Sequence, residues 1–216
     1  MPELTHIALY FAAALALAVT PGPGLFYVAA RSLAGGRTEG IASSFGTGLG
    51  GLVHVLAGSL GVSAILLASS ELFTALKLLG AAYLIWLGFR TFRSAGCHSL
   101  TDLNVQLSAP SIGARKAFRE GVLVEALNPK TAAFFLAFIP QFVNPAGGSI
   151  ALQFVFLGIV SVALNTLADI VVALLAGNIR EGACRRPALI RRLQEGSGAA
   201  MIALGFGLAL ARRPGN

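Results

Sequence analysis

Apolar residues gather in long stretches separated by short polar intervals, and a bilayer crossing needs about 20 such residues in a helix. The predicted spans cover residues 7–30, 41–68, 72–89, 122–142, 150–177 and 197–211. The longest polar interval, 90–119, has room only for a loop with a short helix. The pattern therefore predicts an all-α polytopic membrane protein with about six transmembrane helices, forming a single transmembrane domain over residues 1–216.

Composition agrees with this class of protein. The chain is 56% hydrophobic and 12% charged, and its mean hydropathy is +0.77, well above the range of soluble domains. The net charge of +7 lies in the intervals between predicted spans, so membrane topology explains it and no nucleic-acid partner is expected. The first residues lack the basic segment of a signal peptide, so the first span is expected to be retained.

Lysine and arginine follow the first, third and fifth predicted spans, whereas the second and fourth are followed by none. The residues are Arg31, Arg37, Arg90, Arg93, Arg115, Lys116, Arg119, Arg180, Arg185, Arg186, Arg191 and Arg192. The positive-inside rule places these loops in the cytoplasm and both termini outside. Arg212 and Arg213 favour a cytoplasmic carboxyl terminus instead, which an odd number of spans would produce. Cys97 and Cys184 fall in the cytoplasmic loops, so no disulfide is expected.

Helix-breaking residues interrupt the first and fourth spans. The first break is Thr20-Pro21-Gly22-Pro23-Gly24, the second is Asn128-Pro129-Lys130, and their first prolines are 108 residues apart in a chain of 216. A lipid-facing helix avoids proline and glycine unless the freed backbone groups line a cavity or meet a ligand. The two breaks therefore predict a membrane transport site in a secondary transporter built from repeats.

Each predicted half contains three spans, an odd number, so the second half enters the membrane from the opposite side. The repeats, at about 1–95 and 115–216 with a cytoplasmic loop between them, are thus related by inverted topology. A Gly-Gly pair follows each broken span, at Gly35-Gly36 and Gly147-Gly148.

Small residues also mark one face of the second predicted span. Gly46, Gly50 and Gly58 are separated by multiples of four, which places them near one helix face where backbones approach closely. Such a face permits a homodimer without requiring one, and ordinary helix contact is the plainer interpretation.

Each break is expected to begin a new half-helix. Thr20 and Asn128 are favourable N-cap residues, and each precedes a proline, which suits the first helical position. A helix start presents unpaired N–H groups and a partial positive charge, which suit a carboxylate. The alternative is a proline kink whose freed carbonyl is satisfied by a neighbouring helix.

Two ionisable residues lie deep within predicted spans. Lys130 and Asp169 are each about 16 Å along a helix from a flanking arginine, which places both near the midplane. A charge there costs at least about 2.5 to 3.5 kcal/mol. Lys130 also opposes the dipole of its own helix, so it needs an anionic partner, with Asp169 the first candidate and Glu125 the second. The pair is either a proton or substrate site or a structural ion pair.

Three further observations bear on the site. Asn165 is one turn from Asp169 and is expected on the same side of its helix. His54 lies mid-span, where it either relays protons or bonds to a neighbouring helix. No metal-binding motif is present, neither cysteine lies in a span, and no cofactor is implied, so an enzyme is not expected.

Three segments of the chain resemble the LysE/RhtB family of bacterial amino-acid exporters. They are Thr-Pro-Gly-Pro at 20–23, KLLGAAYLIWLG at 77–88, and Asn-Pro-Lys at 128–130 followed by Phe-Ile-Pro-Gln-Phe at 138–142. The resemblance covers nearly the whole chain. It implies a small multi-pass protein of the bacterial inner membrane that expels amino acids or their analogues, driven by the proton-motive force. Family substrates include lysine, arginine, threonine, homoserine, leucine and cysteine-related compounds, and no residue here selects among them.

The resemblance and the residues together give one transport hypothesis. The half-helix starts and Lys130 receive the substrate carboxylate, an acidic group receives its ammonium group or a proton, and one half rocks against the other. The expected substrate-binding residues are Thr20, Pro21, Gly22, Pro23, Gly24, Asn128, Pro129, Lys130 and Asn165. The expected proton-coupling residues are Asp169, Glu125 and His54. A passive channel or an ion exporter on a related fold is the alternative function.

Overall fold

The computed structural model describes residues 4–93, 110–178 and 187–210, and within these ranges it is entirely helical. The α-helices are α1 (Leu4–Val19), α2 (Pro23–Ala68), α3 (Ser70–Arg93), α5 (Ala114–Ala126), α6 (Pro129–Ala133), α7 (Ile150–Asn178) and α8 (Pro187–Leu210). A π-helical turn η1 (Phe134–Phe138) and 3-10 turns η2 (Ile139–Phe142) and η3 (Pro145–Gly147) follow α6. The predicted all-α class is confirmed. The predictions for Cys97, Cys184, Arg180, Arg185, Arg186, Arg212 and Arg213 lie outside the described residues.

Several helices are long and apolar enough to cross a membrane. Over the described residues these are α2, α3 and α7, and the bent pair formed by α5 and the 129–142 segment is a fourth if counted as one span. The bend in that pair is 43°. Shorter apolar helices cover Ala8–Val19 in α1 and Gly198–Leu210 in α8. The membrane assignment is therefore supported, while the count of six spans stays a prediction.

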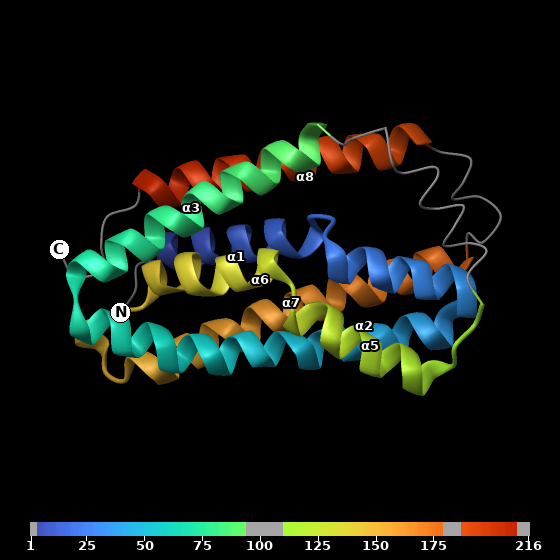
Figure 1. Cartoon of the computed structure of the whole chain (residues 1–216), viewed down its shortest axis with the longest axis horizontal. Coiled ribbons are helices and arrows are strands. Elements are labelled where there is room, and N and C mark those ends of the chain that lie inside the picture. The colour runs from blue at the N-terminus through green and yellow to red at the C-terminus, as the bar shows by residue number, and fades with distance from the viewer. Residues whose placement is uncertain (1–3, 94–109, 179–186, 211–216) are drawn as a thin grey trace.

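Helix α2 contains the reversal predicted between the first two spans, but a single residue makes it in place of a loop. Gly36 has φ 75° and ψ −169°, and Figure 1 shows the chain running to one end of the bundle and returning at this turn. Only glycine adopts this backbone conformation at little cost, so one residue joins two helical arms, 23–35 and 37–68. The predicted loop at 31–40 was wrong. Gly148, the second glycine of the other pair, also has positive φ, at 107°.

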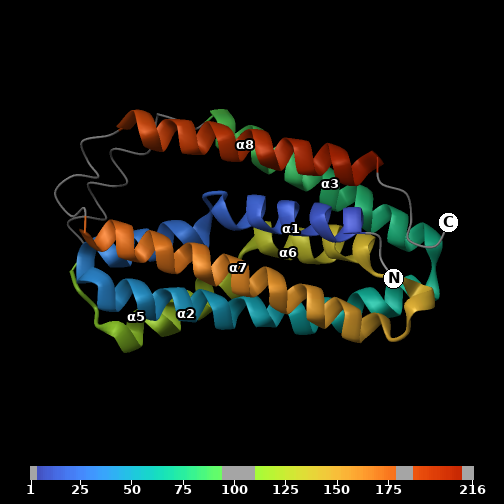
Figure 2. The same ribbon diagram turned by 180° about the vertical axis from the view of Figure 1, so that it is seen from behind.

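Both predicted helix breaks are confirmed. Helix α1 ends at Val19 and α2 begins at Pro23, and α5 ends at Ala126 with α6 beginning at Pro129. Figures 1 and 2 show α1 and α6 in the middle of the bundle, with α2, α5 and α7 on one side of them and the paired helices α3 and α8 on the other. The two breaks meet, since a β-carbon added at Gly22 would lie 2.9 Å from Nζ of Lys130.

Glycines bring the second arm of α2 into backbone contact with α5. A β-carbon at Gly46 would collide with the carbonyl oxygen of Phe118, and one at Gly50 would lie 2.5 Å from that of Val122. The predicted close packing is confirmed for these two residues. Gly58 instead faces the ring of Phe154 in α7, at 2.5 Å. This glycine surface is filled within one chain, so it is not available to form the interface of a homodimer.

Replacing Gly46 with leucine is expected to lower the free energy of unfolding by about 1 to 3 kcal/mol, because the side chain would force the two backbones apart. Thermal unfolding of the purified protein in detergent measures this. The matched control is Gly61→Leu in the same helix, since a β-carbon at Gly61 has no atom within 4 Å among the neighbours considered. Equal unfolding temperatures for the two variants would contradict the contact.

Candidate functional site

Lys130 lies where the two breaks meet and neutralises the end of α1. Its Nζ donates hydrogen bonds to the carbonyl oxygens of Thr20 (2.9 Å) and Leu17 (3.3 Å). These carbonyls lie at the carboxyl end of α1, where the helix dipole is negative and few backbone donors remain; that of Leu17 also accepts from the N–H of Thr20 at 3.2 Å. The side chain is only 5% exposed. Within the described ranges, no carboxylate oxygen lies within 4.0 Å of Nζ. The predicted carboxylate partner was therefore wrong, because a helix end supplies the negative charge instead.

Glu125 lies on the other side of the same junction. Its Oε1 accepts a hydrogen bond from Thr131 Oγ1 (2.6 Å) and its Oε2 accepts one from Asn128 Nδ2 (2.9 Å). A β-carbon at Gly24 would collide with Oε2, so the absence of a side chain there lets the carboxylate reach the first turn of α2. A negative charge is favourable at a helix start. Lys130 lies in the second break and Glu125 lies just before it in α5. Together they compensate the charges of the two helix ends at the first break.

The two expected N-caps have different outcomes. Asn128 caps α6, since its Oδ1 accepts a hydrogen bond from the backbone N–H of Lys130 at 3.0 Å and Pro129 occupies the first turn. Thr20 is not a cap. Its hydroxyl donates to the carbonyl oxygen of Ala16 (2.5 Å), one turn back in α1, and α2 begins only at Pro23. The prolines at positions 21 and 23 separate Thr20 from the new helix, which explains the error.

Asp169 is fully buried in α7 and is only partly satisfied. Its Oδ2 accepts a hydrogen bond from Thr47 Oγ1 (2.7 Å), and Asn165 Nδ2 lies 3.5 Å from the same oxygen. Its Oδ1 has no hydrogen-bond partner. The predicted placement of Asn165 beside Asp169 is confirmed. The predicted ion pair with Lys130 is not formed, since the two groups are more than 4.0 Å apart.

A cavity of about 20 Å³ lies beside these groups. Its polar lining comes from Thr47, Glu125, Thr131, Ser161 and Asn165, and its apolar lining includes Ala14, Leu17, Ala18, Phe135 and Val162. That volume holds about one water molecule and is too small for an amino acid. The structure is therefore closed here, and a molecule of that size would fit only after the helices move.

The sequence analysis did not single out the cavity hydroxyls of Thr47, Thr131 and Ser161. Ser161 shares a hydrogen bond of 2.6 Å with the hydroxyl of Tyr10, which also donates to the carbonyl oxygen of Leu157. Hydroxyl side chains are common in membrane helices because they can bond to their own backbone. In the sequence, only their position marks these hydroxyl residues: each lies on a helix face that also carries a buried carboxyl group or a break.

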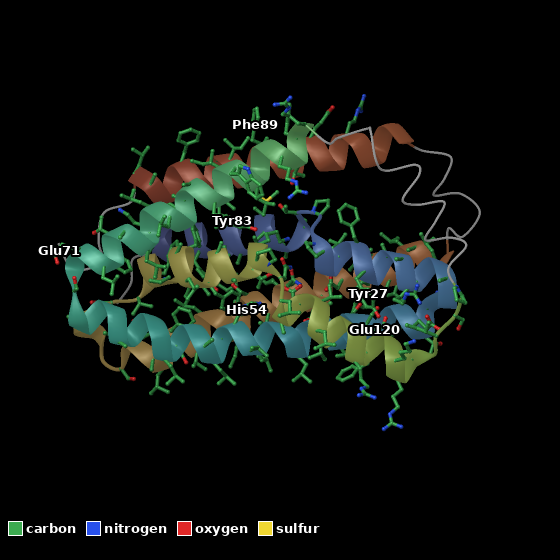
Figure 3. The ribbon with its side chains drawn as sticks, viewed as in Figure 1. Tyr27, His54, Glu71, Tyr83, Phe89 and Glu120 are labelled. Carbon is green, nitrogen blue, oxygen red and sulfur yellow. The ribbon has the colours of Figure 1, made fainter. Side chains whose placement is uncertain are left out.

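His54 bonds to a neighbouring helix, which is one of the two roles that the sequence analysis offered for it. Its Nε2 lies 2.8 Å from the carbonyl oxygen of Glu125, and its ring packs 6.0 Å from the ring of Phe135. Figure 3 shows His54 on α2 near the middle of the bundle. Its role in proton coupling stays a prediction.

A third buried carboxyl group, Glu39, lies at the end of the bundle that carries the basic residues. Its Oε1 accepts hydrogen bonds from Ser111 Oγ (2.5 Å) and from the backbone N–H groups of Ile112 (2.8 Å) and Gly113 (2.7 Å). Its Oε2 lies 3.8 Å from Nη1 of Arg31. We name these five residues the basic-end clamp. It joins both arms of α2 to the start of α5, and the sequence analysis did not identify it.

Tyr27 adds a second tie at this end. Its hydroxyl donates to the carbonyl oxygen of Ala117 and lies 3.1 Å from Glu120 Oε2, and Figure 3 shows the two side chains facing each other.

Comparison with known proteins agrees with this architecture. The model of the LysE type translocator family matches residues 15–212, nearly the whole chain. The chain belongs to this family. The expected family resemblance is thereby confirmed, and this LysE type translocator is a multi-pass protein of the inner membrane.

Several relatives match this LysE type translocator over more than half of its length. An uncharacterized membrane protein of Pseudomonas aeruginosa is 32% identical over 98% of both chains. A homoserine/homoserine lactone efflux protein of Salmonella typhimurium is 31% identical over 94% of this chain and 95% of its own. A leucine efflux protein of Klebsiella pneumoniae is 27% identical over 62% of each chain. No solved structure matches.

Proposed function

We propose that this protein exports amino acids or close analogues from the cytoplasm by antiport driven by the proton-motive force. One observation carries the proposal: Glu125, Lys130 and Asp169 come from three helical segments and are all buried, and Glu125 lines a small cavity beside the meeting of the two helix breaks. Buried ionisable groups in a membrane protein mark ion or substrate pathways. The names of two relatives, for homoserine and leucine efflux, support an amino-acid substrate.

The cavity lining suits the ammonium group of an amino acid. The carboxylate of Glu125 faces the cavity together with the oxygen atoms of Thr47, Thr131 and Asn165, which are hydrogen-bond acceptors. The breaks at 20–24 and 128–130 are proposed to receive the substrate carboxylate. In this conformation Lys130 is bonded to α1 and the start of α2 faces Glu125, so the carboxylate reaches them only when the breaks separate.

Alternating access is proposed to follow from two inverted repeats. The support is a repeated sequence of features: a broken helix, a glycine with positive φ at Gly36 or Gly148, and then a long helix. The long helices pair across the repeats, the second arm of α2 with α7 and α3 with α8. Movement of the inner helix pieces would open the cavity first to one side and then to the other. The basic-end clamp is proposed to hold the cytoplasmic side closed.

Export from loaded cells tests the function. Cells that make the protein are loaded with dipeptides that release one amino acid each, with leucine and homoserine first, and external amino acid is followed over time. We expect one or more to leave several-fold faster than from cells that make the Asp169→Asn variant at equal membrane abundance. A protonophore should remove the difference. Export down a gradient that persists with the protonophore would indicate a channel instead.

A further inference from the structure

The two buried carboxyl groups at the site have different surroundings. We propose that they have separate tasks: Glu125 binds the ammonium group of the substrate, and Asp169 carries the exchanged proton. The inference rests on the proposed export function and assigns the two roles within it.

Both carboxyl oxygens of Glu125 have hydrogen-bond donors. Each oxygen accepts a hydrogen bond, one from Thr131 and one from Asn128, and the carboxylate also lies at the positive end of α2 beside Gly24. Its side chain lines the cavity, although only 3% of the residue is exposed. A compensated anion on the cavity wall is a binding group for a cation such as an ammonium.

Asp169 lacks this compensation. It is 0% exposed, it does not line the cavity, and its Oδ1 has no partner. The charged groups that face it are Glu125 from α5, which disfavours a second negative charge, and Lys130 from α6, which favours one. Neither is in direct contact with it. A buried carboxyl group with so few donors loses its charge most readily by binding a proton.

The hydrogen bonds of Thr47 show what a proton on Asp169 changes. The Thr47 hydroxyl oxygen lies 2.7 Å from Asp169 Oδ2 and 2.8 Å from the carbonyl oxygen of Ser44, but the hydroxyl has one proton to donate. Both bonds form fully only if Asp169 is protonated and donates to Thr47, which then donates to Ser44. If Asp169 loses its proton, Thr47 turns its own proton to the carboxylate and the bond to Ser44 is lost.

This switch connects the proton to the substrate. Thr47 and Asn165 contact Asp169 and also line the cavity. An ammonium bound at Glu125 is stabilised by a second negative charge on Asp169, whereas a proton on Asp169 removes that charge. The proton and the substrate cation therefore compete. An O–H bond forms on Asp169 when the site is open to the outside and breaks when it is open to the cytoplasm, and the ammonium keeps its own protons throughout.

Transport by the full-length protein in liposomes separates the two roles. The probes are radiolabelled leucine and homoserine, and two rates are measured: accumulation driven by a pH gradient, and exchange of labelled for unlabelled substrate without one. We expect Asp169→Asn, which is neutral like the protonated form, to lower accumulation by about tenfold or more, to raise the KM of exchange but lower its rate at saturating substrate far less, and to remove the pH dependence of exchange. Glu125→Gln should lower both rates by about tenfold or more.

Specific results would overturn the division of roles. Exchange by Asp169→Asn that falls, at saturating substrate, as far as accumulation would place Asp169 in the substrate site, and exchange retained by Glu125→Gln would remove Glu125 from it. If the wild-type protein moves neither probe, nor any other amino acid, the proposed function falls as well. Should a variant fail to fold, proton release by the wild-type protein in weakly buffered detergent is decisive: adding either probe should release protons, and a constant pH would refute competition.

Discussion

Replacing Lys130 with methionine is expected to abolish export and to lower the free energy of unfolding by about 3 to 5 kcal/mol. Methionine fills a similar volume but cannot donate a hydrogen bond. The buried carbonyl oxygen of Thr20 would lose its bond from Lys130, and that of Leu17 would keep only its bond from the N–H of Thr20. The negative charge of Glu125 would also lose the nearest buried cation. Thermal unfolding in detergent and export from loaded cells measure the two effects.

The matched control is Lys116→Met, at an exposed lysine whose 3.8 Å pair with Glu120 is a surface interaction. Such a pair contributes about 0 to 1 kcal/mol, so this variant should unfold and export like the wild type. If Lys130→Met is as stable as Lys116→Met, the proposed bridge between Lys130 and α1 is wrong.

The breaks could be predicted from the sequence because their signals are local. Proline lacks a backbone donor and asparagine bonds to a nearby N–H, so Asn128 and Pro129 identify a helix start without any knowledge of the fold. The position of Asn165 followed from helix periodicity alone. The same local rules failed at Thr20, where two prolines and a glycine follow and the threonine bonds back into the helix it ends.

The partner of Lys130 could not be found in this way. Depth along the membrane normal can be counted in residues, and it placed Lys130 and Asp169 at one level. Their separation within the membrane plane depends on how helices pack, which residue counting does not reveal. The predicted partners of Lys130 were also charged side chains, whereas its partner in the structure is the end of a helix. A broken helix creates two such ends, each equivalent to about half a charge.

The two breaks therefore depend on each other. The first break exposes a negative helix end and a positive helix start, and the second places Lys130 at the former and Glu125 near the latter. Separating the breaks would take Lys130 from its carbonyl oxygens and both helix ends from their compensating charges, while Glu125 would keep only its bonds from Asn128 and Thr131. A substrate that brings both an ammonium and a carboxylate group can replace these partners, which gives a physical reason for the breaks to open when it binds and to stay closed when it is absent.

Replacing Glu39 with alanine is expected to open the basic end of the bundle. The change would leave Arg31, the Ser111 hydroxyl and the N–H groups of Ile112 and Gly113 without their shared acceptor. Loss of charged, buried hydrogen bonds of this kind costs about 3 kcal/mol, and each 1.4 kcal/mol taken from the closed form changes the ratio of closed to open molecules about tenfold.

Thiol labelling of the cavity measures this opening. The reporter is Ala18→Cys, a buried cavity-lining position, in a chain whose Cys97 and Cys184 are replaced by serine. A membrane-impermeant reagent applied to the cytoplasmic face of inside-out vesicles should label the Glu39→Ala variant at least about tenfold faster than the parent. Glu71→Ala, at the opposite end of the bundle, is the control, because its carboxylate accepts a hydrogen bond from the nearby Ser69 hydroxyl and is not part of the clamp. Equal labelling of all three proteins would mean that the clamp does not hold the cavity closed, and faster labelling from the outer face alone would place the gate at the other end.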